Sequence, residues 1–311
     1  MGEVKRILLT GASGFIGRAT LRAALNAGLE VVAVQRSTGK PQAGVTFVTA
    51  DLTKEDAVDQ LAAALDGCDA VIHLAAAMSG DPDDHKNLTL GGTERVLAAM
   101  AQTGVGHMTL ASTIAVFDAI QVPIGDALTD DCPLENPALS RDAYSGAKVR
   151  QETLARSAGL DSLAIVRPGI VYDTDHVWNA HLGVAVGPIL FRIGDDSPLP
   201  MCHVDRCAAG LVQATLSRST ETGVILDPEL PSRRDTIAAL KKKGWPAVTI
   251  PLPWKAVWSA ARVLRPISGK MPGVLRENVL RQRMLPMGYR FAALSYENSL
   301  PNPAPDWGGD I

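Results

Sequence analysis

The sequence predicts an α/β protein with a doubly wound parallel sheet and a second, smaller C-terminal domain. Short apolar runs alternate with longer stretches of helical periodicity through residues 6–169. The stretch TGASGFIG (10–17) places three glycines between the first apolar run and the first helical stretch. Continuous apolar strands separated by helices indicate a parallel sheet covered on both faces. Right-handed crossovers then make it doubly wound, of the Rossmann type.

The individual elements follow from the same patterns. Strands are expected at residues 6–11, 30–36, 45–52, 69–77, 107–112 and 163–169. Helices are expected at residues 15–28, 54–67, 93–104 and from about 144 to 158. Gly28 and Gly67 end the first two helices, because glycine readily adopts the left-handed conformation that follows a helix C-terminus.

Composition excludes several classes of protein. The 311 residues carry a net charge of −3 without a basic block, which argues against a nucleic-acid partner. Four scattered cysteines do not make a disulfide framework. No apolar run reaches about 18 residues, so no membrane span is expected. The N-terminus runs into a strand pattern without the features of a signal peptide, and we expect a cytoplasmic protein.

The glycine stretch is the first candidate binding site. Gly11, Gly14 and Gly17 lie between a strand and a helix. A tight turn and a close backbone approach require residues without Cβ, and the following helix N-terminus favours an anion. A dinucleotide pyrophosphate fits this arrangement, although a plain strand-to-helix turn is the alternative.

The end of the second strand indicates which dinucleotide binds. NAD-binding sheets usually place an acidic residue there, to hold the ribose 2′-hydroxyl. This strand ends AVQRSTGK, which lacks an acid and contains Arg36. The guanidinium fork suits phosphate oxygens. The sequence therefore favours NADP over NAD, and a solvated basic loop is the alternative interpretation.

Two domains are expected. The regular alternation ends after Gly169, and all five tryptophans lie beyond it. Residues 201–217 and 223–228 have the pattern of a helix and a strand that return to the sheet. The expected ranges are 1–169 with 201–228 for the dinucleotide-binding domain, and 170–200 with 229–311 for the smaller substrate-binding domain.

Several motifs together resemble the extended short-chain dehydrogenase/reductase family. They are TGASGFIG, DL (51–52), HLAAA (73–77), ASTIAVF (111–117), YSGAK (144–148) and RPGIVYD (167–173). The resemblance covers about the first 230 residues in the family's order. The family includes sugar-nucleotide epimerases, dehydratases and reductases, and relatives that act on sterols and flavonoids. Its C-terminal part, which sets the substrate, matches only loosely here.

The resemblance implies a catalytic group of Tyr144, Lys148 and Thr113. In the family the tyrosine is the general acid/base, and the lysine lowers its pKa and binds the nicotinamide ribose. Free tyrosine titrates near pH 10, and a cation one helical turn away favours the phenolate. The family's hydroxyl position falls on Thr113. Ser112 should face the other side of its strand, because successive side chains alternate.

The resemblance also implies a cofactor site and a homodimer. The cofactor residues lie in the glycine stretch and at the ends of later strands. They are Gly11, Ser13, Gly14, Phe15, Ile16, Gly17, Arg36, Asp51, Leu52, Leu74, Ala75, Ala76, Lys148 and Pro168.

The chain departs from the family's pattern at two places. Thr89 stands where the family often has an asparagine, and Asn87 is nearby but out of register. Dehydratases of the family place an Asp-Glu pair after the active-site threonine, whereas Ile114 and Ala115 follow Thr113 here. Neither side chain can transfer a proton, so dehydration is not expected.

Three further features have ordinary interpretations. CHVDRC (202–207) lacks a second ligand pair with metal-like spacing, and no metal site is predicted. His73 lies in the HLAAA segment, where the resemblance implies mainly backbone contact with the cofactor. PWKAVWSAARVL (253–264) has an apolar face that suits packing within the smaller domain, with a substrate wall or membrane contact as alternatives.

The expected function is an NADP-dependent oxidoreductase or epimerase that transfers hydride at a secondary alcohol or ketone. The expected substrate is a sugar nucleotide. NADP favours net reduction, because the cellular NADP pool is generally held reduced and family epimerases more often retain NAD. A reductase of a sterol-like or other apolar ketone is one alternative. A non-catalytic NADP sensor is another, although such proteins often lose the tyrosine.

Overall fold

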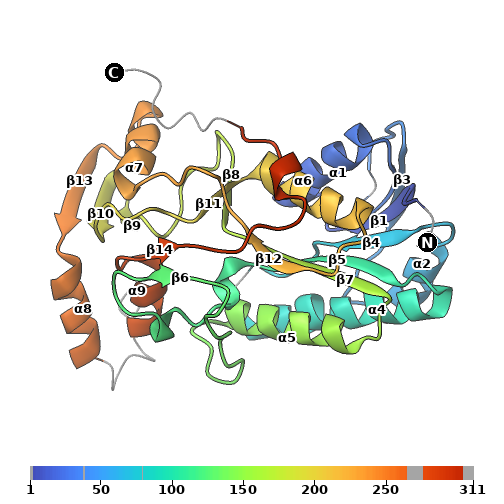
Figure 1. Cartoon of the computed structure of the whole chain (residues 1–311), viewed down its shortest axis with the longest axis horizontal. Coiled ribbons are helices and arrows are strands. Elements are labelled where there is room, and N and C mark those ends of the chain that lie inside the picture. The colour runs from blue at the N-terminus through green and yellow to red at the C-terminus, as the bar shows by residue number, and fades with distance from the viewer. Residues whose placement is uncertain (1–2, 38, 79, 265–275, 304–311) are drawn as a thin grey trace.

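The protein is built around one parallel sheet, as the computed structural model of residues 3–37, 39–78, 80–264 and 276–303 describes (Figure 1). Seven strands lie in the order β12-β7-β5-β4-β1-β2-β3, and every pair is parallel. Their bounds are β1 Arg6–Thr10, β2 Glu30–Gln35, β3 Val45–Thr49, β4 Ala70–His73, β5 His107–Ala111, β7 Ser162–Pro168 and β12 Thr222–Ile225. The predicted doubly wound sheet is confirmed, and the late strand returns to it as the edge strand β12.

Helices cover both faces of the sheet (Figure 1). One face carries α1 (Phe15–Asn26) and α6 (Val204–Leu216), which pack against each other. The opposite face carries α2 (Ala57–Ala64), α4 (Gly91–Thr103) and α5 (Ala143–Ser157). The sheet is therefore buried on both faces, which explains why its strands read as continuous apolar runs.

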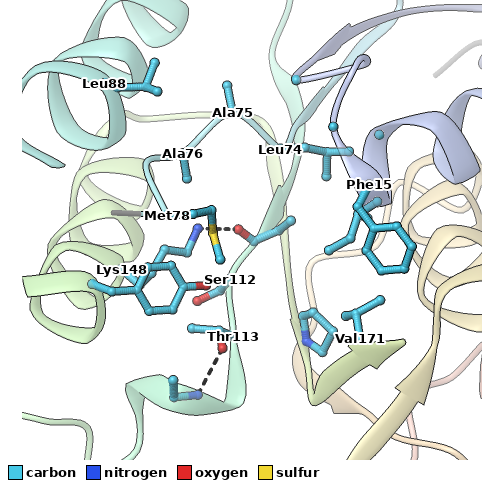
Figure 2. Close-up of a pocket in the computed structure, with 18 of the residues that line it drawn as sticks. Phe15, Leu74, Ala75, Ala76, Met78, Leu88, Ser112, Thr113, Lys148 and Val171 are labelled. Atoms are coloured by element: carbon cyan, nitrogen blue, oxygen red, sulfur yellow. Dashed lines mark hydrogen bonds between the residues drawn. The ribbon is translucent and has the colours of Figure 1, made fainter. Parts of the chain in front are cut away.

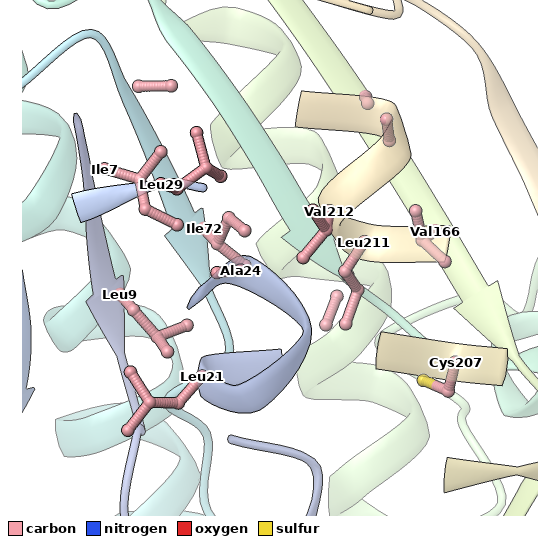
Figure 3. Close-up of a cluster of buried hydrophobic side chains, with 14 of the residues drawn as sticks. Ile7, Leu9, Leu21, Ala24, Leu29, Ile72, Val166, Cys207, Leu211 and Val212 are labelled. Carbon is pink, nitrogen blue, oxygen red and sulfur yellow. The ribbon is translucent and has the colours of Figure 1, made fainter. Parts of the chain in front are cut away.

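Two hydrophobic clusters fill the spaces between these layers. Ile7 and Leu9 of β1 point into the first cluster, beneath α1 and α6 (Figure 3). Leu8 points into the second cluster, beneath the helices of the other face. This alternation follows from the two-residue period of a strand. The clusters hold the carboxyl ends of the strands in place, and the candidate site lies there.

A smaller unit lies at one end of the molecule (Figure 1). Its sheet has the order β13-β10-β9, and helices pack around it. The bounds are β9 Gly183–Val186, β10 Ile189–Ile193, α7 Arg233–Lys242, β13 Val248–Leu252, α8 Trp254–Val263 and α9 Glu277–Arg283. Two strand pairs connect this unit to the rest: β8 (Ile170–Tyr172) with β11 (Met201–His203), and β6 (Ala127–Leu128) with β14 (Gly288–Tyr289).

The C-terminal segment returns to the large sheet. Leu294, Tyr296 and Leu300 belong to the first hydrophobic cluster, and this segment contacts β12 and α6. The division into residues 1–169 with 201–228 and residues 170–200 with 229–311 stays a prediction, and 265–275 and 304–311 lie outside the described residues. The packing suggests moving 294–300 to the larger unit.

Short helical elements connect the main ones. They are α3 (Pro82–Asp84), the π-helix η1 (His85–Leu90), and the 3-10 helices η2 (Ile114–Val116), η3 (Ala119–Gln121) and η6 (Glu297–Ser299). Within the described parts of the chain, no helix is long and apolar enough to cross a bilayer. The apolar face of α8 packs on Ile193, Leu280 and Met284, in agreement with the packing interpretation.

Candidate active site

A cavity of about 590 Å³ opens at the carboxyl ends of the central strands. Phe15 and Val171 line one side of it, and Ser112, Thr113 and Lys148 line the other (Figure 2). Ligands of open parallel sheets bind at this edge, where the strand order reverses. The predicted cofactor residues line this cavity, with the exception of Asp51.

The glycine stretch forms one wall of the cavity and needs its glycines for space. Gly11 has a φ of +69°, and a Cβ on it would lie 3.0 Å from the Ala75 nitrogen. A Cβ on Gly17 would lie 2.0 Å from the Gly11 carbonyl oxygen. Helix α1 begins after Gly14 without a side-chain cap, so its first N–H groups are available for an anion. This cradle fits a dinucleotide pyrophosphate.

Arg36 lies at the cavity edge immediately after β2. The strand ends at Gln35, and both residues line the cavity. Hydrogen bonds from Thr53 are the main cause that lowers the pKa of Asp51, and the charges of Lys54 and Arg36 add smaller contributions. The Asp51 carboxylate accepts those bonds from the Thr53 nitrogen at 3.0 Å and hydroxyl at 2.8 Å. Its oxygens are thus engaged in a local turn.

Tyr144 and Thr113 meet across the cavity floor. Tyr144 is in the first turn of α5, and Thr113 is the second residue after β5. A side-chain hydrogen bond joins Thr113 to Tyr144. Burial raises the pKa of Tyr144 above its usual value, and this hydrogen bond acts in the opposite direction. The charges that act on Tyr144 are those of Asp142 and Arg141, so the expected lowering of the Tyr144 pKa by Lys148 is not found.

Lys148 lies one helical turn beyond Tyr144 and is 3% exposed. Its Nζ donates to the Ala111 carbonyl oxygen at 2.6 Å and to the Gln151 side-chain oxygen. Burial lowers the pKa of Lys148 to about 8, and the nearby Glu152 carboxylate works against that shift. Lys148 also lines the cavity, so it can contact a ligand there.

Ser112 is held by a buried ion pair. Its hydroxyl donates to Glu152 Oε1 at 2.5 Å, and Arg167 donates to both oxygens of the same carboxylate at 2.9 and 2.7 Å. The Arg167 guanidinium lies 5.0 Å from the centre of the Phe117 ring. This network fixes the end of β5 on α5. Ser112 is thus engaged, and Thr113 faces Tyr144.

The far side of the cavity is polar and was not predicted from the sequence. Its lining residues there are Arg141, Asp142, His181, Gln282 and Arg283. The Asp142 side chain caps α5 by accepting from the Ser145 nitrogen at 2.8 Å. Burial, together with the positive charge of Arg283, lowers the pKa of His181 well below its usual value, so His181 is neutral at neutral pH.

One buried arginine places two of these residues. Arg233 is 2% exposed and donates to the carbonyl oxygens of His181 at 2.8 Å, Asp195 at 2.5 Å and Arg283 at 3.1 Å. It therefore joins three segments that are distant in the sequence. No pattern in the sequence indicates that His181 and Arg283 line the cavity, because the Arg233 hydrogen bonds that place them form only when the smaller unit packs.

The remaining predicted features lie outside the cavity lining. Thr89 Oγ1 accepts a hydrogen bond from the Ala77 nitrogen at 3.0 Å, so it ties the loop after β4 to η1. Cys202 and Cys207 are buried in the first hydrophobic cluster. His203 caps α6. Within the described residues, no three His, Cys, Asp or Glu side chains group as metal ligands.

The sequence matches the model of a known protein family. Residues 7–172 match the model of the "NAD dependent epimerase/dehydratase family". The chain belongs to this family. It is thus an extended short-chain dehydrogenase/reductase, as its motifs suggested, and the family is NAD(P)-dependent.

Curated members of the family are similar over part of their lengths. The 2-alkyl-3-oxoalkanoate reductase of Stenotrophomonas maltophilia is 29% identical over 172 residues, covering 54% of this chain and 51% of that protein. The N-acetyl-alpha-D-glucosaminyl-diphospho-ditrans,octacis-undecaprenol 4-epimerase of Escherichia coli O157:H7 is 27% identical over 197 residues, covering 59% and 55%. The alignments span only about half of these relatives.

A solved member of the family has the same fold. The UDP-Glc/GlcNAc 4-epimerase of Campylobacter jejuni superposes with a TM-score of 0.65 at 21% identity, covering 80% of this chain and 87% of that one. This agreement concerns the fold. The family comprises epimerases, dehydratases and reductases, so the reaction has to be argued from the site.

Proposed function

We propose that this chain is an NADP-dependent reductase of a ketone carried by a sugar nucleotide. The hydrogen bond between Tyr144 and Thr113, on the opposite side of the cavity from the glycine stretch, carries the proposal. When bound, a nicotinamide cofactor supplies hydride to a carbonyl carbon or accepts it from a carbinol carbon. Tyr144 donates the proton to the carbonyl oxygen, and Thr113 holds that oxygen by a hydrogen bond.

The protonation state of Tyr144 supports reduction. Because burial raises its pKa, Tyr144 keeps its proton at neutral pH unless a further positive charge lies beside it. A protonated phenol is the acid that a carbonyl reduction requires. Epimerisation uses the same transfer in both directions, with the sugar turning over between the two steps.

The residues after Thr113 argue against dehydration. Ile114 and Ala115 line the cavity, and neither can donate or accept a proton. Water elimination needs an acid for the leaving hydroxyl and a base for the adjacent proton. Asp142 is the nearby carboxylate that lines the cavity, and it is engaged as the cap of α5.

A cationic group on the far side, the Arg283 guanidinium, supports an anionic substrate. Arg283 lines the cavity, and the Asp142 carboxylate is 3.9 Å away, whereas the Arg141 guanidinium is engaged by Glu135 and the Ala115 carbonyl. Arginine binds phosphate oxygens through paired N–H donors, so a diphosphate linker suits this position. Tyr144 would then act on the sugar attached to that linker.

An apolar ketone is the second candidate. Met78 is 79% exposed and lines the cavity together with Phe15, Leu88, Ile170 and Val171. An apolar acyl chain could lie on these side chains. Turnover of a 3-oxoacyl substrate, without turnover of 4-keto sugar nucleotides, would favour this candidate. The homodimer and the cytoplasmic location stay predictions.

Arg36 is expected to select NADP. Arg36→Ala should weaken NADPH binding by about tenfold to 100-fold, since a hydrogen-bonded charge contact of this kind is worth about 1.5–3 kcal/mol. NADH binding should stay the same. Fluorescence titration of both cofactors measures the difference, and Arg22→Ala, which removes a charge from an exposed part of α1, is the matched control. Equal wild-type affinities for the two cofactors would refute the NADP proposal.

Cofactor consumption distinguishes reduction from epimerisation. Incubation with NADPH and a panel of 4-keto sugar nucleotides should consume one NADPH for each alcohol formed. Absorbance of NADPH and mass spectrometry of the products measure both quantities. Product interconversion without NADPH loss would instead identify an epimerase. A 4-keto-6-deoxy product from a plain hexose nucleotide would show that the argument from Ile114 and Ala115 is wrong.

A further inference from the structure

A chain of buried polar side chains leads from the cavity floor to the beginning of the glycine stretch. Lys148 donates to the side-chain oxygen of Gln151, and the Gln151 amide nitrogen donates to Thr93 Oγ1 at 2.8 Å. His73 Nε2 lies 2.9 Å from the same Thr93 oxygen. His73 Nδ1 lies 2.7 Å from Thr10 Oγ1. The chain thus connects α5, α4, β4 and β1.

Counting donors and acceptors fixes the direction of each bond. The single hydroxyl proton of Thr93 goes to the Thr89 carbonyl oxygen at 2.5 Å, so Gln151 and His73 both donate to Thr93. His73 is therefore protonated on Nε2, and its Nδ1 accepts the hydroxyl proton of Thr10. Burial, followed by the Lys148 charge, lowers the pKa of His73 to about 3. A neutral imidazole is what this pattern requires.

We propose that Gln151 is a positioning residue, which holds the Lys148 amine in place and orients its remaining N–H toward the cofactor cavity. An ammonium group has three donors, and the Ala111 carbonyl and Gln151 take two of them. The Gln151 amide cannot flip, because its nitrogen would then face the Lys148 donors and its oxygen would lose the anchor to Thr93. Gln151 itself is 1% exposed and does not line the cavity.

The charge of Lys148 depends on this arrangement. Without the Gln151 oxygen, the buried Lys148 ammonium keeps only one of these two acceptors, the Ala111 carbonyl. The pKa of Lys148 would then fall further. The nearby charged and titratable groups are Glu152, which raises the Lys148 pKa, and His73, which is neutral. Gln151 therefore sets the pH above which Lys148 can no longer donate a charged hydrogen bond to a ligand.

The test measures cofactor affinity over a pH series. It rests on the proposed function, because it requires that the protein bind a nicotinamide cofactor. NADPH and NADH fluorescence titrations run from about pH 6 to about pH 10. Wild-type affinity should fall as pH rises through about 8, where the ammonium loses its proton. In Gln151→Met the midpoint should move down by about one pH unit. In Gln151→Glu it should move up, because a carboxylate stabilises the ammonium.

If the pH midpoints of the two Gln151 variants shift in opposite directions, Gln151 acts by positioning Lys148. Loosened packing would instead shift both midpoints in the same direction. Gln213→Met, on the half-buried face of α6, makes the same change of side chain away from the cavity and should not shift the midpoint. Unchanged midpoints in both Gln151 variants, or shifts of the same sign, would overturn the proposal.

A second readout keeps this test separate from the proposed function. Labelling of Lys148 by an amine-reactive anhydride, located by peptide mass spectrometry, depends on the fraction of neutral amine. Its pH midpoint should move in the same directions in the two variants. If wild type binds neither cofactor, the proposed function fails, while the labelling midpoints still decide the role of Gln151.

Discussion

Tyr144→Phe is expected to lower turnover at least about 100-fold while cofactor binding remains, because the substitution removes the hydroxyl that donates the proton. The ring keeps its place in the first turn of α5, and Lys148 keeps its bonds to Ala111 and Gln151. Steady-state rates with a reducible ketone, together with NADPH titration, measure both effects.

Tyr296→Phe is the matched control for this variant. Tyr296 lies in the first hydrophobic cluster, away from the cavity lining, and its replacement should leave turnover within a few-fold of wild type. If Tyr144→Phe is as active as this control, Tyr144 has no part in proton transfer. A loss of NADPH binding in Tyr144→Phe would instead mean that the Tyr144 hydroxyl serves to bind the cofactor.

Arg167→Met is expected to lower the free energy of unfolding by about 3–5 kcal/mol, because it leaves the Glu152 carboxylate buried beside Ser112 without its paired donor. Both arginine bonds to Glu152 are short, and the side chains are 9% and 2% exposed. The contact with the Phe117 ring is lost as well. Urea unfolding followed by circular dichroism measures the change.

A second arginine on the same carboxylate provides the control. Arg156 lies 3.7 Å from Glu152 with a side chain that is 49% exposed. Arg156→Met should therefore cost less than about 1 kcal/mol. The double variant Arg167→Met with Glu152→Met should recover much of the lost stability, since it removes the unpaired charge. Equal costs for the two arginines would contradict the assignment of Arg167 as the dominant partner.

The large sheet was predictable because its signals are local. The apolar runs of β1, β2 and β4 and the glycines of 10–17 each determine structure within a few residues. The pairing of Tyr144 with Lys148 needs only one helical turn, and the preference for Thr113 over Ser112 followed from strand alternation and motif register. The structure places these groups around one cavity.

The substrate side was not predictable, because it depends on contacts between distant segments. His181 and Arg283 reach the cavity through the carbonyl bonds of Arg233, which no pattern along the chain indicates. The direction of the Tyr144 pKa was also missed. Spacing suggested a nearby cation, whereas the amount of burial is known only from the packed structure.

The return of the C-terminal segment limits how early the chain can finish folding. A Cβ on Gly223 would lie 2.5 Å from Leu294, so the segment lies tightly against the edge strand β12, and Leu300 packs beside α6 (Figure 1). On the ribosome, α6 and β12 are made before residues 294–300, so the apolar surface that they share with Leu294 and Leu300 stays uncovered until those residues emerge. The nascent chain is thus more prone to associate with other chains before residues 294–300 are made, and chaperone binding should be concentrated in that interval.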